Sequence, residues 1–289
     1  MQYKRKLKAG VILAVLICLT GCGAKAPKTA SSAGNINFVA TNVSDVTSIM
    51  EQTKTAAIQK AEEVAEQIRV EQEQKNPRKG YLIAIDAGHQ AQGNSEKEPI
   101  GPGATESKAK VAGGTRGVAT GIPEYEPTLQ VSLKLRDALE EKGYQVLMIR
   151  ETNDVNISNA ERATMANEAG ANAFIRIHAD GSESSSAAGM MTICQTPSNP
   201  YNGELYQQSR ALADCILNQT AAATGGVKRN VWETDTMSGI NWAKVPTTIL
   251  EMGFMTNPSE DQQMASDDYQ MKIVEGIVKG MDAFFGIEE

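Results

Sequence analysis

The sequence predicts an α/β domain in which a twisted, mostly parallel sheet of about six strands lies between helices. Two observations lead to this fold. From Gly80 to the C-terminus, short apolar runs alternate with longer segments of helical periodicity, which is the order of βαβ units. The chain has two histidines, His89 and His178, and each follows or ends a strand-like apolar run. Open α/β sheets place their ligands at this end of their strands.

The composition fits one sizeable domain with an N-terminal appendage. The chain has 289 residues, of which 41% are hydrophobic, and its formal net charge is -7. An acidic chain of this kind offers no basic face that could neutralise phosphates. We therefore expect no nucleic-acid partner.

The first 21 residues have the order of an export signal. Positive charges up to Lys8 precede a short apolar run over 11–19, and Leu19-Thr20-Gly21-Cys22 follows. This ending resembles the lipobox of bacterial lipoproteins, in which cleavage before the cysteine leaves a lipid-modified N-terminus. We expect residues 1–21 to be a signal peptide and Cys22 to carry the lipid that anchors an extracytoplasmic protein to the cell membrane. A plain cleaved signal is the alternative.

Two segments separate this signal from the domain. Residues 22–45 are rich in Ala, Ser, Thr and Asn and show no apolar periodicity, which predicts a flexible tether. Residues 46–78 carry a narrow apolar stripe among Glu and Lys, which predicts a helical stalk ending at Asn76-Pro77. A short coiled coil and a helix packed on the domain are the alternatives.

The elements of the domain at 80–289 are predicted in chain order. A buried strand begins at Tyr81 and stops in Asp86-Ala87-Gly88-His89, and a long polar loop over 90–121 follows. Pro127 suits the first turn of a helix that ends at Gly143, and Ser158 suits the cap of a helix over 156–169. The remaining expected elements are strands at 144–149, 173–180, 189–195, 227–232 and 247–250, and helices at 201–223 and 269–285.

A few residues of this pattern form the ligand set of a zinc hydrolase. Two imidazoles and one carboxylate hold Zn²⁺ and leave a position for an activated water, and His89 and His178 supply the imidazoles. Glu124 and Glu126, which precede the first helix of the domain, are both candidates for the carboxylate. Glu251 follows the apolar run Ile249-Leu250 and is a candidate general base.

The motifs together resemble those of the zinc-dependent N-acetylmuramoyl-L-alanine amidases of bacterial cell-wall turnover. The resemblance covers roughly residues 80–285. It implies a single α/β domain that cleaves the amide between the lactyl group of muramic acid and L-alanine in peptidoglycan. The matching motifs are Asp86-Ala87-Gly88-His89, Arg150 with Asp154, Asn167, Ile177-His178-Ala179-Asp180 and Leu250-Glu251-Met252-Gly253-Phe254-Met255-Thr256-Asn257.

The resemblance also implies roles for single residues. His89 and His178 would bind Zn²⁺, and Glu251 would be the catalytic carboxylate. The family places its third ligand five residues before the first leucine of the following helix, here Leu129, which favours Glu124 over Glu126.

This chain departs from the family pattern in three places. Ala87 stands where proline is common, and Asp180 stands where asparagine is frequent. The loop over 90–121 is longer than in the shortest members, and its glycine content favours a substrate-facing flap over an inhibitory helix.

Other functions are compatible with the same residues. Metal, water and glutamate would equally serve a zinc carboxypeptidase or deacetylase that acts on peptidoglycan. A catalytically silent wall-binding regulator is a further alternative, although such a protein is expected to lack one of the four polar groups, and all four are present. The need for a regulatory protein stays open.

Overall fold

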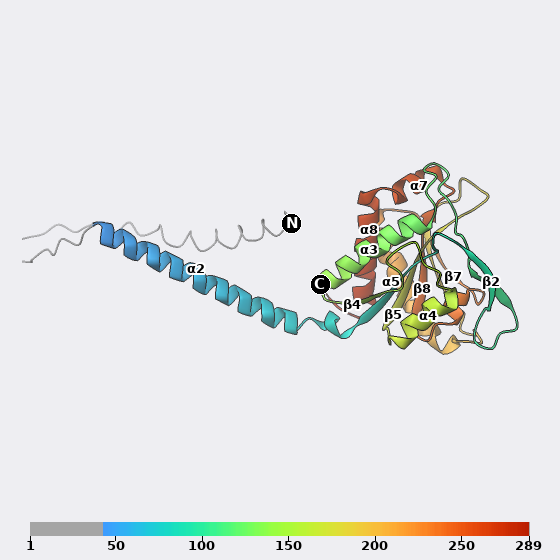
Figure 1. Ribbon diagram of the computed structural model, residues 1–289, viewed down its shortest axis with the longest axis horizontal. Helices are drawn as coiled ribbons and strands as arrows, with labels where there is room; N and C mark the ends of the chain where they lie inside the picture. The colour runs from blue at the N-terminus through green and yellow to red at the C-terminus, as the bar shows by residue number, and fades with distance from the viewer. Residues whose placement is uncertain (1–42, 289) are drawn as a thin grey trace, which may run out of the picture. The chain divides into compact units, whose positions relative to one another are not determined.

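The computed structural model describes residues 43–288, without the side chains of residues 43–47, 69, 70 and 72–74 (Figure 1). The expected signal peptide at 1–21, Cys22 and nearly all of the expected tether at 22–45 lie outside the described residues. Among the described residues, no helix is long and apolar enough to cross a membrane.

The helix α2 (Val43–Gln74) begins three residues before the segment 46–78 that was expected to form a stalk and covers most of it. Its described apolar side chains, including Ile49, Met50 and Ile58, are exposed. The helix ends before Asn76-Pro77, as the sequence predicts, because proline cannot continue the backbone hydrogen bonding of a helix. Asn76 caps the short 3₁₀ turn η2 (Pro77–Gly80) by accepting a hydrogen bond from the backbone N–H of Arg78.

Six strands form the central sheet, in the order β4-β1-β5-β8-β6-β7. The first four of these run parallel, whereas β6 is antiparallel to β8 and parallel to β7. The prediction of a mostly parallel sheet of about six strands is therefore confirmed. The strands are β1 (Leu82–Ala87), β4 (Gln145–Met148), β5 (Ala173–Asp180), β6 (Met190–Cys194), β7 (Lys228–Glu233) and β8 (Thr247–Phe254).

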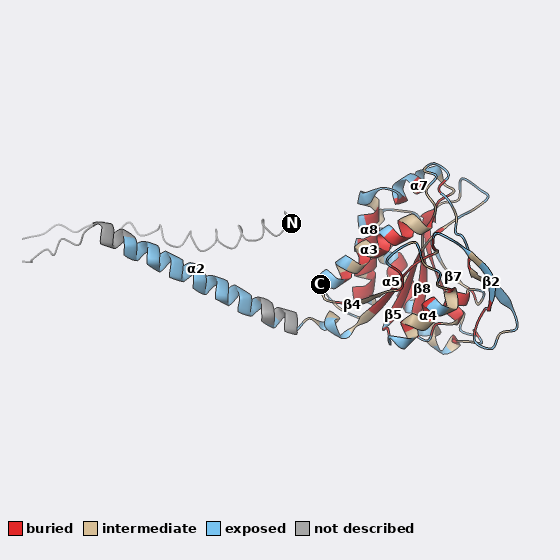
Figure 2. Ribbon diagram, in the orientation of Figure 1, coloured by how far each residue is buried: buried red, intermediate tan, exposed pale blue. Residues whose placement is uncertain are grey.

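Helices cover both faces of the sheet, and the buried residues lie between the layers (Figure 2). Successive side chains of a strand point to opposite faces. In β1, Ile83 and Ile85 pack with the main core, whereas Ala84 packs with a second cluster. The main core includes residues of α3 (Tyr125–Lys142), α5 (Tyr206–Thr224) and α8 (Asp267–Phe284). The second cluster includes residues of α4 (Asn159–Glu168), on the other face.

The ends of the predicted helices agree with the residues that predicted them. Gly143 closes α3 with φ of 100°, a conformation that glycine adopts without steric cost. Ser158 and Glu161 form a reciprocal capping box at the start of α4. Helix α5 begins at Tyr206, later than the expected 201, because the 3₁₀ turn η3 (Gly203–Leu205) precedes it. Two short helices, α6 (Ser238–Asn241) and α7 (Pro258–Met264), were not predicted.

The segment 90–121 is not the continuous loop that the sequence predicts. It contains an antiparallel hairpin of β2 (Asn94–Pro99) and β3 (Ser107–Val111). The buried carboxylate of Glu98 holds the hairpin to α4 by accepting a hydrogen bond of 3.2 Å from the backbone N–H of Ala160. Strand β2 escaped prediction because its residues before Pro99 are polar on both faces, without the apolar alternation that marks a half-buried strand.

Candidate metal centre

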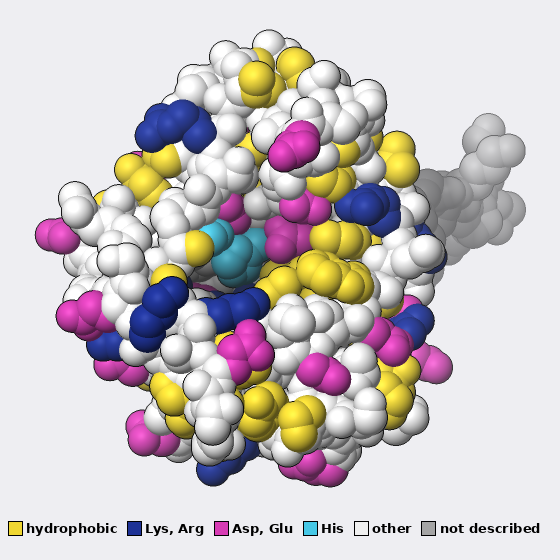
Figure 3. All heavy atoms as spheres, turned by 90° about the vertical axis from the view of Figure 1, so that its right-hand side faces the viewer, with side chains coloured by type: hydrophobic (Ala, Val, Ile, Leu, Met, Phe, Trp, Pro, Cys, Tyr) yellow, Lys and Arg dark blue, Asp and Glu magenta, His cyan; other side chains and the backbone are white. Residues whose placement is uncertain are grey.

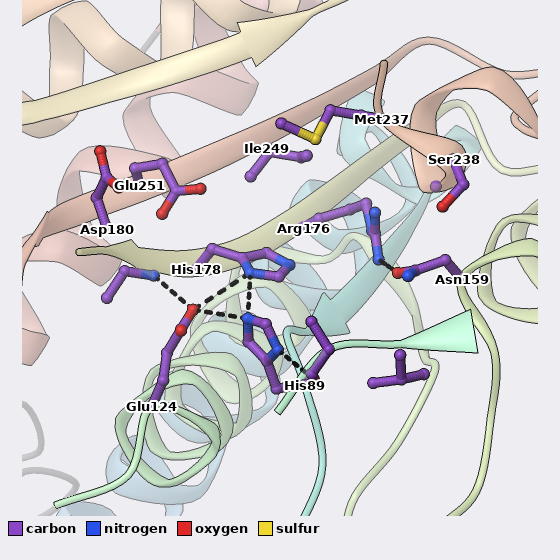
Figure 4. Close-up of a pocket in the computed structure, with 14 residues that line it drawn as sticks. His89, Glu124, Asn159, Arg176, His178, Asp180, Met237, Ser238, Ile249 and Glu251 are labelled. Carbon is purple, nitrogen blue, oxygen red and sulfur yellow. Dashed lines mark hydrogen bonds and ion pairs between the residues drawn. The ribbon is translucent and has the colours of Figure 1, made fainter. Parts of the chain in front are cut away.

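The residues singled out in the sequence meet where neighbouring parallel strands end. His89 follows β1, His178 lies near the end of β5, and Glu251 lies on β8. These strands are adjacent in the sheet, and His178 is the register partner of Glu251. Parallel strands present their carboxyl ends at one edge, so three distant segments deliver their polar side chains to one place (Figure 4).

His89, Glu124 and His178 form a compact triangle of potential ligand atoms. Oε1 of Glu124 lies 3.0 Å from Nε2 of His89 and 3.3 Å from Nδ1 of His178. The two imidazole nitrogens are 3.1 Å apart. Among the described residues these three form a group that could hold a metal ion, and Glu126, the alternative carboxylate, is not in it.

Backbone groups fix the orientation of two of these side chains. Glu124 is buried and accepts hydrogen bonds from the N–H of Ala179, at 3.0 Å, and of Thr115, at 2.9 Å. Nδ1 of His89 lies 2.8 Å from the carbonyl oxygen of Ala112, which turns Nε2 toward Glu124. A hydrogen bond of this kind selects the tautomer in which Nε2 can act as a ligand.

The approach of the two imidazoles depends on the backbone at Gly88. A Cβ placed at this position would lie 2.5 Å from the His178 ring, so only glycine leaves room for that ring. The next residue, His89, has φ of 60°, a region that non-glycine residues seldom occupy. Such strained residues cluster at functional sites. The glycine of the Asp-Ala-Gly-His motif is therefore required for the triangle to form.

The triangle opens into a cavity of about 240 Å³. Figure 3 shows the histidine side chains at the base of a hollow, with acidic, basic and hydrophobic groups around them. His89, Glu124, His178, Asp180 and Glu251 line one end, and Asn159, Arg176, Met237, Ser238 and Ile249 line the other (Figure 4). Val111 and Ala112, from the segment 90–121, also line the cavity. This part of the chain therefore faces the cavity, and the hairpin of β2 and β3 within it is tethered to α4.

Comparison with known proteins identifies the family of the chain. Residues 83–283 match the family model described as N-acetylmuramoyl-L-alanine amidase. The chain belongs to this amidase family. The resemblance of the sequence motifs to the family is thereby confirmed.

Individual relatives and solved structures give the same result for this amidase. It is 31% identical to the uncharacterized protein YqiI of Bacillus subtilis over 72% of this chain and 87% of the relative. It is 29% identical to the N-acetylmuramoyl-L-alanine amidase Rv3717 of Mycobacterium tuberculosis, over 72% and 88% of the two chains. The crystal structure of the amidase Ami1 from Mycobacterium smegmatis has a TM-score of 0.65 and 28% identity, covering 72% of this chain and 97% of Ami1.

A buried network of charged side chains lies next to the amidase site. Asp86 accepts hydrogen bonds from Nη1 of Arg162, at 2.6 Å, and from Nε of Arg176, at 2.8 Å. Arg150 donates to the carbonyl oxygens of Ala87, at 2.7 Å, and Gly88, at 2.9 Å. The network therefore holds the backbone that leads into His89.

Arg162 and Arg176 were not singled out in the sequence, although a signal for the second was present. Arg176 stands between Ile175 and Ile177 in a run that reads as a buried strand. A charge inside such a run needs a partner, because an unpaired buried charge is costly. Asp86, at the same depth of the neighbouring strand, is that partner, and the two residues are in register.

The electrostatics of Glu124 and His178 favour the forms that bind a cation, whereas the burial of His89 is outweighed by Glu124, which raises the pKa of that histidine. Burial alone would raise the pKa of Glu124, but the hydrogen bonds and charges of His178 and His89 outweigh it and hold the pKa well below its usual range. Burial lowers the pKa of His178 to about 4. An ionised carboxylate and a neutral imidazole are the forms that ligate metals.

Glu251 differs from Glu124 because one of its oxygens has no partner among the residues that the structure describes. Oε2 of Glu251 and Nε2 of His178 are buried atoms without a hydrogen bond within the described part of the chain. Burial, reinforced by the charges of Glu124 and Asp180, raises the pKa of Glu251 well above its usual value. Buried polar atoms without partners are rare, and a raised pKa in a cavity is typical of a group that transfers protons.

Proposed function

We propose that this protein is a zinc-dependent N-acetylmuramoyl-L-alanine amidase that hydrolyses the amide between the lactyl group of N-acetylmuramic acid and L-alanine during cell-wall remodelling. One observation carries the proposal. The triangle of His89, Glu124 and His178 shares a cavity with Glu251, whose carboxyl group has an oxygen without a partner among residues 43–288.

The residues fit Zn²⁺ in donor type and spacing. Two imidazole nitrogens and one carboxylate oxygen are the protein ligands of many catalytic zinc sites. Ligand atoms at about 2.05 Å from a tetrahedral zinc lie about 3.3 Å from one another. The three separations in the triangle are 3.0, 3.1 and 3.3 Å. An outward adjustment of the side chains by a few tenths of an ångström would therefore complete the site.

Glu251 would transfer the protons, and the carbonyl group of Ala112 would orient His89. Oε2 of Glu251 is available to accept a proton from the attacking water and to deliver it to the nitrogen of the departing alanine. The Ala112 carbonyl keeps Nε2 of His89 directed at the site throughout. When bound, zinc supplies a Lewis acid that polarises the scissile carbonyl and acidifies water.

The relatives favour amide cleavage over the alternatives. Rv3717 of Mycobacterium tuberculosis and LytC of Bacillus subtilis are both named N-acetylmuramoyl-L-alanine amidases. A zinc carboxypeptidase or deacetylase would need the same metal and base, but the relatives named here are not described as either. A silent wall-binding regulator would have no use for an unpaired buried Glu251.

We further propose that lipid on Cys22 holds the protein at the outer side of the cell membrane, as the first 22 residues predict. The test is fractionation of cells that express the full chain or its Cys22→Ala variant, with intact-mass measurement of the protein. The full chain should sediment with membranes and carry the mass of the lipid. Equal partition of both proteins into the soluble fraction would contradict the anchor.

Mass spectrometry of digested peptidoglycan tests the proposed activity. Residues 23–289 are incubated with purified peptidoglycan, with and without a zinc chelator and with zinc added back. Release of stem peptides that begin with L-alanine, from intact glycan strands, is expected only when zinc is present. Deacetylated sugars or shortened stems would assign a different hydrolase, and chelator-resistant cleavage would remove zinc from the proposal.

A further inference from the structure

The cavity has two ends of opposite charge, and the catalytic proposal uses one of them. Figure 4 shows Glu124, Asp180 and Glu251 beside the histidines, and Arg176, Asn159 and Ser238 at the far end. The far end contains no carboxylate among the described residues that line the cavity. Its chemistry is therefore that of an anion site.

Arg176 is a buried side chain whose orientation is fixed by hydrogen bonds. Its side chain is 4% exposed, so it is held in place. Nε donates to Asp86 and Nη2 donates to the side-chain oxygen of Asn159, at 2.8 and 2.7 Å. Within the described part of the chain, Nη1 has no hydrogen-bond partner.

The wall opposite Arg176 is shaped around the guanidinium. A Cβ placed at Gly239 would lie 1.8 Å from Nη1 of Arg176, so any larger residue would displace the group. Gly239 and Ser238 line the cavity together with Arg176. Two of the three guanidinium nitrogens are thus fixed by hydrogen bonds, and the third, Nη1, packs against Gly239, which also lines the cavity.

The charge of Arg176 is only partly compensated. Asp86 is shared between Arg162 and Arg176, so one carboxylate faces two guanidinium groups. Arg150, the third buried arginine of this region, bonds to the backbone and adds no negative charge. The network therefore keeps a net positive charge next to the cavity. A bound carboxylate would balance it.

We propose that Arg176 is a specificity-determining residue that binds a carboxylate on the peptide part of the substrate, beyond the alanine whose nitrogen is released. This inference rests on the proposed function. In an N-acetylated glycan the sugars are neutral, and the lactyl carboxyl is consumed in the scissile amide. The carboxylate must therefore belong to the peptide, so stem peptides in which that group is free are preferred over stems in which it is an amide.

A matched pair of substrates tests the inference. Two synthetic N-acetylmuramoyl dipeptides carry L-alanine followed by an acidic residue, with its α-carboxyl group free in one and converted to a carboxamide in the other. The zinc-loaded protein should hydrolyse the acid with kcat/KM about 10- to 100-fold higher, the range expected for a charge-assisted hydrogen bond. Arg176→Gln should reduce this ratio to near 1, and Arg176→Lys should retain part of it.

Arg136→Gln is the control, because it makes the same chemical change at a guanidinium of α3 that pairs with Glu151 and does not line the cavity. It should change both rates equally and leave their ratio as in the unmodified protein. Equal hydrolysis of the two substrates by the unmodified protein would overturn the inference, and so would a ratio that survives in Arg176→Gln with its melting temperature preserved.

Calorimetric titration separates this inference from the proposed function. The free dipeptides, with the acid or the amide, are titrated into the zinc-loaded protein, which requires no cleavage. Tighter binding of the acid that is lost in Arg176→Gln supports the inference even if the muramoyl substrates are not hydrolysed. Absence of binding, or equal binding of both dipeptides, counts against it.

Discussion

The choice between Glu124 and Glu126 can be decided by a pair of single substitutions. Glu124→Gln removes the carboxylate whose oxygen lies 3.0 and 3.3 Å from the imidazole nitrogens of His89 and His178. Glu126→Gln makes the same chemical change in the first turn of α3, outside that group. The amide keeps the shape of the side chain in both variants.

The expected loss follows from the number of ligands. Structural zinc sites with four ligands bind with about 10–16 kcal/mol, or roughly 2.5–4 kcal/mol per ligand. At 1.4 kcal/mol for each factor of ten, Glu124→Gln should weaken zinc binding about 10²- to 10³-fold. Glu126→Gln should bind zinc within about threefold of the unmodified protein, since the half-buried Glu126 is not one of the three grouped ligand residues.

Competition against a chromophoric zinc chelator measures both affinities, and thermal unfolding of the metal-free proteins checks that they are folded. Glu124→Gln replaces an oxygen that accepts from the backbone of Thr115 or Ala179, so a fall in its melting temperature is expected as well. If Glu124→Gln binds zinc normally, or if Glu126→Gln shows the larger loss, the proposed ligand set is wrong.

Three further predictions concern single residues. Glu251→Gln should retain zinc but lower kcat at least 10²-fold, because it cannot accept a proton; near-normal turnover would exclude Glu251 as the base. Burial would raise the pKa of Asp86, but Arg162 and Arg176 hold it below its usual range, so its stabilisation is present above the unfolded pKa and is lost as pH falls. Between about pH 5 and 2 the free energy of unfolding of Asp86→Asn should therefore fall less steeply than that of the unmodified protein. At pH 7 this variant should be about 3–5 kcal/mol less stable. Asp261 accepts hydrogen bonds from the N–H of Ala119 and Thr120, so Asp261→Ala should increase hydrogen exchange over 116–122, and unchanged exchange there would argue against this anchor.

The elements that the sequence predicts well are those with a clear local signal. The apolar run that ends in Asp86-Ala87-Gly88-His89 became β1, since a fully buried parallel strand carries apolar residues on both faces. Ser158 and Gly143 marked helix ends correctly because capping and the left-handed conformation are properties of single residues. These signals need no knowledge of the rest of the chain.

The features that escaped depend on contacts between distant segments. The hairpin of β2 and β3 is held by Glu98 at α4 and by Lys108, whose Nζ donates to the carbonyl oxygen of Thr236. Asp86 likewise binds two arginines that lie far from it along the chain. Arg162 is 76 positions away and Arg176 is 90 positions away. Proximity of Glu124 to the histidines could be suggested by a family resemblance, but local spacing alone left Glu126 equally suitable.

The positions of the site residues along the chain bear on when metal can be taken up during folding. His89, Glu124 and His178 come from separate segments, and β1 and β5 must pair before they meet. Pairings this far apart in sequence form slowly, because loop closure precedes the contacts that compensate for it. We expect zinc to bind only the assembled sheet, where it would stabilise the finished fold by mass action, so the yield of refolding should rise with zinc while the rate of folding stays the same.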